Sequence, residues 1–439
     1  MLNTEEQLAR LRQRVAAIDL RFAQRRFETP TPAAAALEFQ EPGAAVEPEP
    51  ETDQLTPSRI EEWADGQVVE NQFGAHFQTE QLFPGHKPHG AADIGSLHEL
   101  PADLMDALGG GDIPSTHCER WAFLDTETTG LAGGSGTYTF LIGVGRITRE
   151  GFRLRQFFMR DYAEEPSLLA ALEEHLSGFD VLVTYNGRTY DQPLLETRYR
   201  MCRFKPPFAR MAHMDLLHGA RRLWKLRLDN CKLMELERQI LGVHREGDLP
   251  GHLIPYVYFD YVRSREACRL VPIFHHNAID ILTLACLMAI VPAAFRKSDH
   301  VGLARLGVRR GEDLSGIARW LIAAGEHERG LELLKRAVDV GLPDGLLFRA
   351  MWDIALLEKK LGRAHAALQM FTELAEFRNA HRCGALEELA KFYEHEERNF
   401  ALALEFTNQA LALGGDEAFR HRKARLEKKL AKPKNRKLL

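Results

Sequence analysis

The sequence predicts an α/β domain, a mixed β-sheet flanked by helices, followed by an all-α domain of helical repeats. Two observations lead to this fold class. Residues 118–296 contain three strand-like apolar runs and then alternating helical and strand patterns, an order typical of a mixed sheet covered by helices. Residues 303–413 are almost entirely helical in pattern and carry a weak internal repeat. A chain of 439 residues is long enough for two or three domains.

The composition is that of a globular protein, with 45% hydrophobic residues. No apolar run approaches the ~20 residues that span a bilayer, and the most apolar stretch, 281–295, is interrupted by Pro292. The first residues are charged and lack the apolar core of a signal peptide. The six cysteines form no CxxC pair, which argues against a zinc module or a disulfide framework. We therefore expect a cytoplasmic protein that does not bind membranes.

The N-terminal segment, residues 1–28, is predicted to form an amphipathic helix. Its apolar residues recur with 3-4 spacing and make one stripe: Leu8, Leu11, Val15, Ile18 and Phe22. This stripe can dock on a partner, pair with itself or pack on the protein's own body. Residues 29–95 begin with a Pro-, Ala- and Glu-rich segment and are predicted to be a disordered linker.

The α/β domain is predicted to occupy residues 96–296. Strands are expected at 120–127, 138–147, 152–160, 180–186 and 212–217. Helices are expected at 166–176, 189–201, 230–241 and in the run after residue 272.

The second domain is predicted to occupy residues 297–415. Three segments align in register, 315–341, 349–376 and 384–413, each reading as helix, short polar turn and helix. They resemble degenerate tetratricopeptide repeats, which implies a protein partner or a platform for nucleic acid; an unrelated helical bundle is the alternative. Residues 416–439 are predicted to be a basic C-terminal tail, a second possible contact for phosphates or only a solubilising segment.

Acidic side chains stand at the ends of several predicted core elements. Asp125 and Glu127 lie two residues apart on a strand, so their carboxylates share a face and repel each other unless a cation lies between them. Asp191 opens a helix after a buried strand, and Asp280 lies on an apolar helix. Four such carboxylates suit two Mg²⁺ or Mn²⁺ ions and the two-metal chemistry of a phosphodiester hydrolase.

Three motifs together resemble those of the DEDD exonuclease superfamily, which has a ribonuclease H-like fold. They are "FLDTETTGL" at 123–131, "YNGRTYD" at 185–191 and "HHNAID" at 275–280. More narrowly, the stretches 124–145 and 231–261 are similar to the YprB-type ribonuclease H-like domain family. The resemblance covers roughly residues 118–290, under half of the chain.

The resemblance implies a role for each matching residue. Asp125, Glu127, Asp191 and Asp280 match the four metal-binding acids. The turn that receives the terminal nucleotide is matched by Thr128, Thr129, Gly130 and Leu131, the leucine as a wedge against the last base. Asn186 matches the polar residue beside the third acid.

Two adjacent histidines are candidates for the general base. His276 is one helical turn before Asp280 and shares its face, whereas His275 does not. The resemblance, by contrast, places a basic histidine five residues before the last acid, at His275. We favour His276. Asp215 also follows a strand pattern and could be a ligand, but we interpret it as a structural or capping residue, and Asp248 as part of a loop.

The segment 198–232 follows the third acid and carries ten Lys or Arg against two Asp, with Phe204, Phe208 and Trp224 among them. Positive charge follows a phosphate backbone and aromatic rings stack on bases, so this segment is a candidate nucleic-acid surface. The alternative is a solvated helix face with buried aromatic rings.

These observations predict a metal-dependent nuclease, a 3′→5′ exonuclease acting on a single-stranded 3′ end of DNA or RNA. Two alternatives remain open at this stage. One is a nucleic-acid or protein scaffold that keeps the fold without turnover, and the other is a metal-dependent endonuclease. The sequence does not choose between DNA and RNA.

Overall fold

The structure is a computed structural model that describes residues 59–109, 112–130, 136–245, 248–296 and 300–431. It divides into an α/β unit that ends at Gly307 and a helical unit that begins at Val308. The predicted N-terminal helix at 1–28 and the Pro-rich first part of the predicted linker lie outside the described residues.

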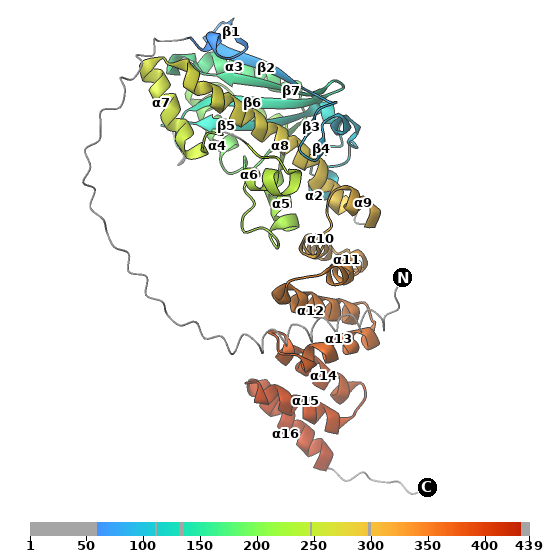
Figure 1. Cartoon of the computed structure of the whole chain (residues 1–439). Coiled ribbons are helices and arrows are strands. Elements are labelled where there is room, and N and C mark those ends of the chain that lie inside the picture. The colour runs from blue at the N-terminus through green and yellow to red at the C-terminus, as the bar shows by residue number, and fades with distance from the viewer. Residues whose placement is uncertain (1–58, 110–111, 131–135, 246–247, 297–299, 432–439) are drawn as a thin grey trace, which may run out of the picture. The chain divides into compact units, whose positions relative to one another are not determined.

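The α/β unit is built on a seven-stranded sheet with the order β1-β2-β7-β6-β5-β8-β9 (Figure 1). Strands β5, β8 and β9 are parallel to one another and the other pairings are antiparallel, which confirms the predicted mixed sheet. The seven strands are β1 (Gly66–Asn71), β2 (Gly74–Pro84), β5 (Trp121–Thr128), β6 (Thr139–Thr148), β7 (Gly151–Phe158), β8 (Val181–Thr184) and β9 (Ala212–Asp215). A separate short hairpin joins β3 (Pro88–His89) to β4 (Ala92–Asp93).

The sheet begins earlier in the chain than the sequence predicted. We assigned residues 29–95 to a linker, but β1 and β2 extend the sheet, with β2 paired to β7 from Phe77 to Pro84. The prediction failed here because β1 is a polar edge strand, with the burial pattern of an exposed element and only a weak apolar alternation. The described part of this segment therefore belongs to the α/β unit.

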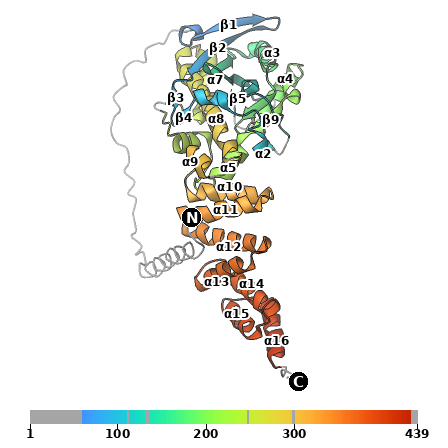
Figure 2. The ribbon, with the colours of Figure 1, turned by 90° about the vertical axis from the view of Figure 1, so that its right-hand side faces the viewer.

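Helices cover both faces of the sheet (Figure 2). Helix α8 (Val271–Arg296) packs on β5, β6 and β7, and α3 (Glu165–Leu176) packs on β2 from the other side. The approach of α8 is close because β6 carries glycines beneath it: a Cβ at Gly143 would lie 2.2 Å from Ile281 and 2.3 Å from Asn277. Small residues here bring the polar face of α8 onto the end of β5.

Helix α8 is the core helix of this unit. By length and composition, the stretch Ala267–Arg296 is also apolar enough to cross a membrane, but 72% of its most apolar window is buried inside the structure. Burial on this scale is what packing against a sheet requires of a central helix.

The remaining α-helices described in this unit connect or follow the strands. They are α2 (Asp106–Gly109), α4 (Asp191–Met201), α5 (Leu216–Trp224), α6 (Leu233–Leu236), α7 (Ile254–Ser264) and α9 (His300–Arg305). Helix α6 continues into a π-helical turn, Glu237–Leu241, which ends at Gly242 in the left-handed region (φ 70°). Such turns are frequent at functional sites.

The helical unit consists of antiparallel helix pairs in which each helix packs on its sequence neighbour. Its helices are α10 (Gly311–Ala323), α11 (His327–Val340), α12 (Asp344–Lys360), α13 (Ala364–Glu376), α14 (Arg382–His395), α15 (Phe400–Ala412) and α16 (Glu417–Ala431). The three predicted helix-turn-helix segments correspond to α10–α11, α12–α13 and α14–α15. The predicted basic tail is in part a helix, because α16 packs on α15 through Phe419 and Leu426, which are both buried.

Candidate active site

Two carboxylates stand side by side where β5 leaves the core. Asp125 is paired with Gly143 of β6 and Glu127 with Leu141, so both side chains lie on the face of the sheet that α8 covers. Burial raises the pKa of both carboxyl groups well above the ordinary value, and the neighbouring acids raise it further. Ionised together without a cation, these groups are costly.

The other two predicted acids lie close enough to repel this pair. Asp280 of α8 and Asp191 at the start of α4 both contribute to the raised pKa of Asp125 and of Glu127. Burial also raises the pKa of Asp191, to about 6, although the Thr126 hydroxyl donates to its Oδ1. The structure thus brings the four sequence-predicted acids together from β5, α4 and α8.

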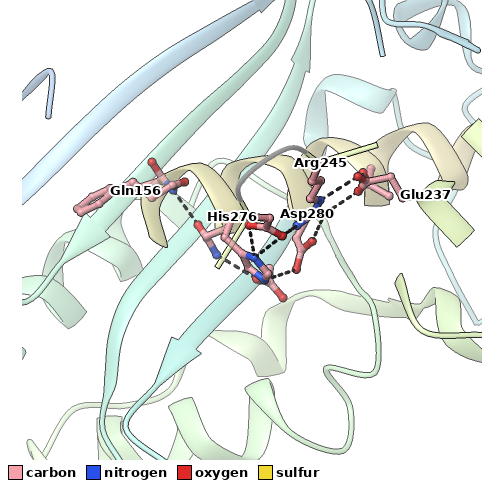
Figure 3. A network of polar contacts seen from close by, with 10 residues as sticks. Gln156, Glu237, Arg245, His276 and Asp280 are labelled. Atoms are coloured by element: carbon pink, nitrogen blue, oxygen red, sulfur yellow. Dashed lines mark hydrogen bonds and ion pairs between the residues drawn. The ribbon is translucent and has the colours of Figure 1, made fainter. Parts of the chain in front are cut away.

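A buried chain of amides holds Asp125 in place (Figure 3). The Asn277 Nδ2 donates to Asp125 Oδ2 at 3.0 Å, and the Gln156 Nε2 donates to Asn277 Oδ1 at 2.9 Å. Gln156 is fixed in turn by Thr79, whose hydroxyl donates to its Oε1 at 3.0 Å. Asn277 and Gln156 were not predicted from the sequence, although "HHNAID" already places Asn277 one turn from Ile281 and three residues before Asp280.

The histidine that faces the acids is His276. It is buried, and its Nε2 lies 3.6 Å from Asp280 Oδ2. Its Nδ1 lies 2.9 and 3.0 Å from the two carboxylate oxygens of Asp248, so Nδ1 carries the proton and Nε2 is left able to accept one. His275, the next residue on the helix, is exposed. Asp248, which we interpreted as a loop residue, therefore orients the candidate base.

A buried arginine joins this site to the π-helical turn. Arg245 makes a two-pronged bond to Glu237, at 2.8 and 2.6 Å, and also contacts Asp248 at 3.2 Å and Asp280 through Oδ1. Burial lowers the pKa of Arg245, but its bonds to Glu237 and Asp280 outweigh that effect and raise it overall. Figure 3 shows Glu237, Arg245, Asp280 and His276 as one continuous network beside α8. Both residues lie in the stretch 231–261 that resembles the YprB-type family, but the sequence alone assigned neither of them a role.

The donor set fits hard divalent cations. Within the described ranges, no Lys or Arg is paired with Asp125, Glu127 or Asp191. Buried carboxylates without a cationic partner are suitable ligands for Mg²⁺ or Mn²⁺. Arg245 engages one oxygen of Asp280 and leaves the other facing His276. A cation that binds all four acids must therefore compete with Arg245 and with Thr126 for one oxygen each.

The turn after β5 is held by its own hydroxyls. Thr128 donates to the carbonyl of Gly130 at 3.0 Å, and the Thr129 hydroxyl accepts from the backbone N–H of Tyr138 at 2.9 Å. These contacts fix the turn that the sequence predicted to receive a nucleotide, but Leu131 lies outside the described residues.

Asn186 follows β8 in the left-handed region (φ 68°), and its backbone N–H donates to Asp215 at 2.8 Å. Asp215 also accepts from the backbone N–H of Arg188 and caps α5 through Leu217. This is the structural role that we expected of Asp215. Asn186 itself borders the open side of the site.

A cleft of about 660 Å³ opens beside the acids and contains Asp125, Asp280 and Asn186 in its lining. Three exposed cations line it as well, Arg221, Lys225 and Lys232, and the described residues give none of them a carboxylate partner.

The aromatic rings of the segment 198–232 do not contribute to this cleft. Phe208 and Trp224 are buried in the core, and Phe204 packs edge-to-face on Phe73 with ring centroids 4.8 Å apart. The aromatic rings of this segment therefore follow the second interpretation, in which they are buried. The cations that line the cleft follow the first, because they form an exposed basic surface.

Comparison with known proteins agrees with this geometry. Residues 122–291 match the family model of the RNase H superfamily, so the α/β unit is an RNase H-like domain. The chain is also 33% identical over 294 residues to the uncharacterised protein YprB of Bacillus subtilis (strain 168), an alignment that covers 66% of this chain and 68% of YprB. The chain therefore belongs to the same family as YprB. Membership of the RNase H superfamily indicates a nuclease that uses divalent metal ions and binds nucleic acid.

Proposed function

We propose that this protein is a metal-dependent 3′→5′ exonuclease that removes nucleotides from a single-stranded 3′ end of DNA or RNA. The observation that carries the proposal is the convergence of Asp125, Glu127, Asp191 and Asp280 at the end of β5, beside a cleft with exposed cations. Strongly perturbed carboxyl groups in a cleft are typical of a catalytic site.

The four acids would hold two Mg²⁺ or Mn²⁺ ions, which when bound would offset the negative charge of the reacting phosphate and make water a better nucleophile. Asn277 and Gln156 keep Asp125 from turning away from the site. Arg245 holds Asp280 in the same way and supplies positive charge at the edge of the acid cluster.

His276 acts as the general base. Its Nε2 accepts a proton from the attacking water, and Asp248 stabilises the resulting imidazolium through Nδ1. The water oxygen bonds to phosphorus, the bond from phosphorus to the 3′ oxygen breaks, and the leaving oxygen takes up a proton from solvent. The products are a 5′-mononucleotide and a strand with a new 3′-hydroxyl.

Substrate binding divides between two parts of the site. The terminal nucleotide would be received by the turn Thr128, Thr129, Gly130 and Leu131, and Asn186 would contact it from the segment that follows β8. The cations Arg221, Lys225 and Lys232 would bind phosphates further along the strand.

The helical unit supports a separate role. We propose that its helix pairs are tetratricopeptide-like repeats that bind a protein partner. All six cysteines are free thiols, which supports a reducing, cytoplasmic location.

A substrate panel tests the proposal. End-labelled linear and circular single strands of DNA and RNA, and the corresponding duplexes, are incubated with the full chain and with Asp125→Asn, with Mg²⁺, Mn²⁺ or EDTA. We expect metal-dependent shortening of linear single strands from the 3′ end by wild type alone. Cleavage of circles would make the protein an endonuclease. Binding without cleavage would make it a scaffold, and equal cleavage by Asp125→Asn would reject the site.

A further inference from the structure

A second group of ligating side chains lies at the other end of β5. Glu119 belongs to the short 3₁₀ turn Cys118–Arg120 that leads into the strand, and His117 caps this turn. His98 comes from another 3₁₀ turn, Gly95–Glu99. Asp125 follows only after four further residues of extended strand, roughly 13 Å of chain. The group is therefore separate from the candidate active site.

The carboxylate of Glu119 lies between two imidazole rings. Its Oε1 is 3.0 Å from His98 Nε2, and its Oε2 is 4.0 Å from His117 Nδ1. One ligand atom from each of the three residues lies within 4.8 Å of the other two. The two rings are 5.3 Å apart and meet edge to face at 62°. The three ligand atoms thus surround one small volume.

An ordinary surface contact accounts for only part of this arrangement. One histidine is enough to pair with Glu119, and the backbone N–H of Glu119 already approaches His117 Nδ1 at 3.4 Å. His117 accepts that N–H as the cap of the turn, so its Nδ1 lone pair faces Glu119 and lies 4.0 Å from the carboxylate oxygen that His98 does not contact. A cation that takes a lone pair from each ring and one carboxylate oxygen satisfies all three groups.

The donor set selects the kind of metal. Two imidazoles and one carboxylate suit zinc and neighbouring transition metals, whereas Mg²⁺ prefers oxygen ligands alone. Three protein ligands leave one coordination position open to water. The buried thiol of Cys118 lies 3.8 Å from His117 Nδ1 but donates to the carbonyl of His98, 3.5 Å away, so we do not count it as a fourth ligand.

We propose that His98, His117 and Glu119 form a zinc site that ties the turn Gly95–Glu99 to the start of β5. The site is independent of the nuclease reaction. Its ligands come from two turns that flank α2, which packs on α8, so a bound ion would stabilise the chain at the base of the core helix.

Cobalt(II) substitution tests the site without any reliance on activity. The full chain is stripped of metal and titrated with Co²⁺, whose intense visible d–d absorption reports four-coordinate binding, and then with Zn²⁺. We expect wild type and Asp125→Asn to give the same band, displaced by one equivalent of Zn²⁺. His98→Ala and His117→Ala are expected to weaken Co²⁺ binding by more than about tenfold.

The exposed His252, far from the cluster in sequence, provides a matched control, and His252→Ala should bind Co²⁺ like wild type. Far-UV circular dichroism verifies that each variant is folded. If one histidine variant fails to fold, Glu119→Gln replaces it. The proposal is overturned by a wild type without the band, by a band that survives in the histidine variants, or by a band lost in Asp125→Asn.

Discussion

Single side chains decide the chemistry of the candidate site, and the pair His276–Asp248 shows how. His276 is buried against the acids and its Nδ1 is fixed by Asp248, while its neighbour His275 points to solvent. His276 is thus the candidate base, and His275, one residue away, is a control position on the same helix.

We predict that His276→Ala lowers the cleavage rate by about 10²–10⁴-fold, because the proton acceptor is lost. Asp248→Asn should lower it less, since the imidazole remains but loses its orienting carboxylate. His275→Ala should leave the rate near that of wild type. Single-turnover kinetics with saturating metal measure the three variants, and an equal loss in His275→Ala and His276→Ala would contradict the assignment.

At the scale of elements, the site exists because α8 lies unusually close to β6. Gly143 is the contact: it is paired with Asp125 across the sheet, and Asn277 and Ile281 occupy the space that a side chain would need. Helix and strand therefore position Asp125 and Asp280 together.

We predict that Gly143→Ala costs about 1–3 kcal/mol of stability, because a methyl group must displace α8. The displacement also breaks the hydrogen bond from Asn277 to Asp125. The cleavage rate should therefore fall by more than the loss of unfolding free energy alone explains. Gly251→Ala is the control, since nothing lies within 4 Å of a Cβ there. Urea unfolding and the cleavage rate are compared, and a fully active, equally stable Gly143→Ala would show that the contact is unimportant.

In the helical unit, one buried carboxylate joins α14 to α16. Arg425 binds both oxygens of Glu394 at 2.8 Å, and Lys429 binds one at 2.9 Å. The Arg425 bond, with Lys429, lowers the pKa of Glu394 to about 2.

The pKa of Glu394 is lower in the folded state than in the unfolded state. The stabilisation by its ionised carboxylate is therefore complete above the unfolded pKa of ~4.3 and is lost as the pH falls toward 2. We predict that Glu394→Gln destabilises the full chain at pH 7 by roughly 1–3 kcal/mol. The difference in unfolding free energy between Glu394→Gln and wild type should shrink as the pH falls from about 5 to about 3, because the carboxyl group of wild type takes up its proton between the unfolded and folded pKa values. Urea midpoints from circular dichroism at each pH provide the measurement, and a difference that does not depend on pH would exclude the ionised pair as its cause.

At the scale of the molecule, the elements and residues that could be predicted are those with a recognisable pattern in the sequence. Apolar strands, the long apolar helix α8 and the helix pairs all show periodicity, and Asp125 to Asp280 stand in ordered motifs. Arg245, Glu237 and Gln156 leave no such pattern, because their importance comes from contacts between distant segments. Strands β1 and β2 were missed because β1, at the sheet edge, and β2, beside it, carry many polar residues, a composition that resembles a linker.

The basic lining of the cleft gives a prediction for nucleic-acid binding. Arg221→Ala combined with Lys225→Ala should weaken binding of single strands of any sequence and flatten its salt dependence by about 1–2 units of log slope. The matched control exchanges Arg200 and Arg238, exposed arginines outside the cleft lining, for alanine. Fluorescence anisotropy at several salt concentrations, with Ca²⁺ in place of Mg²⁺, gives the slopes. Equal salt-dependence slopes for the two double variants would show that the cations of the cleft do not bind the strand.

The central claim is that the acids at the end of β5 hold divalent ions. Isothermal titration of metal-stripped full chain with Mn²⁺, for wild type, Asp125→Asn and Glu127→Gln, tests it most directly. We predict that wild type binds Mn²⁺ and that each variant loses this binding while keeping its fold. Wild-type binding unchanged in both variants would contradict the account.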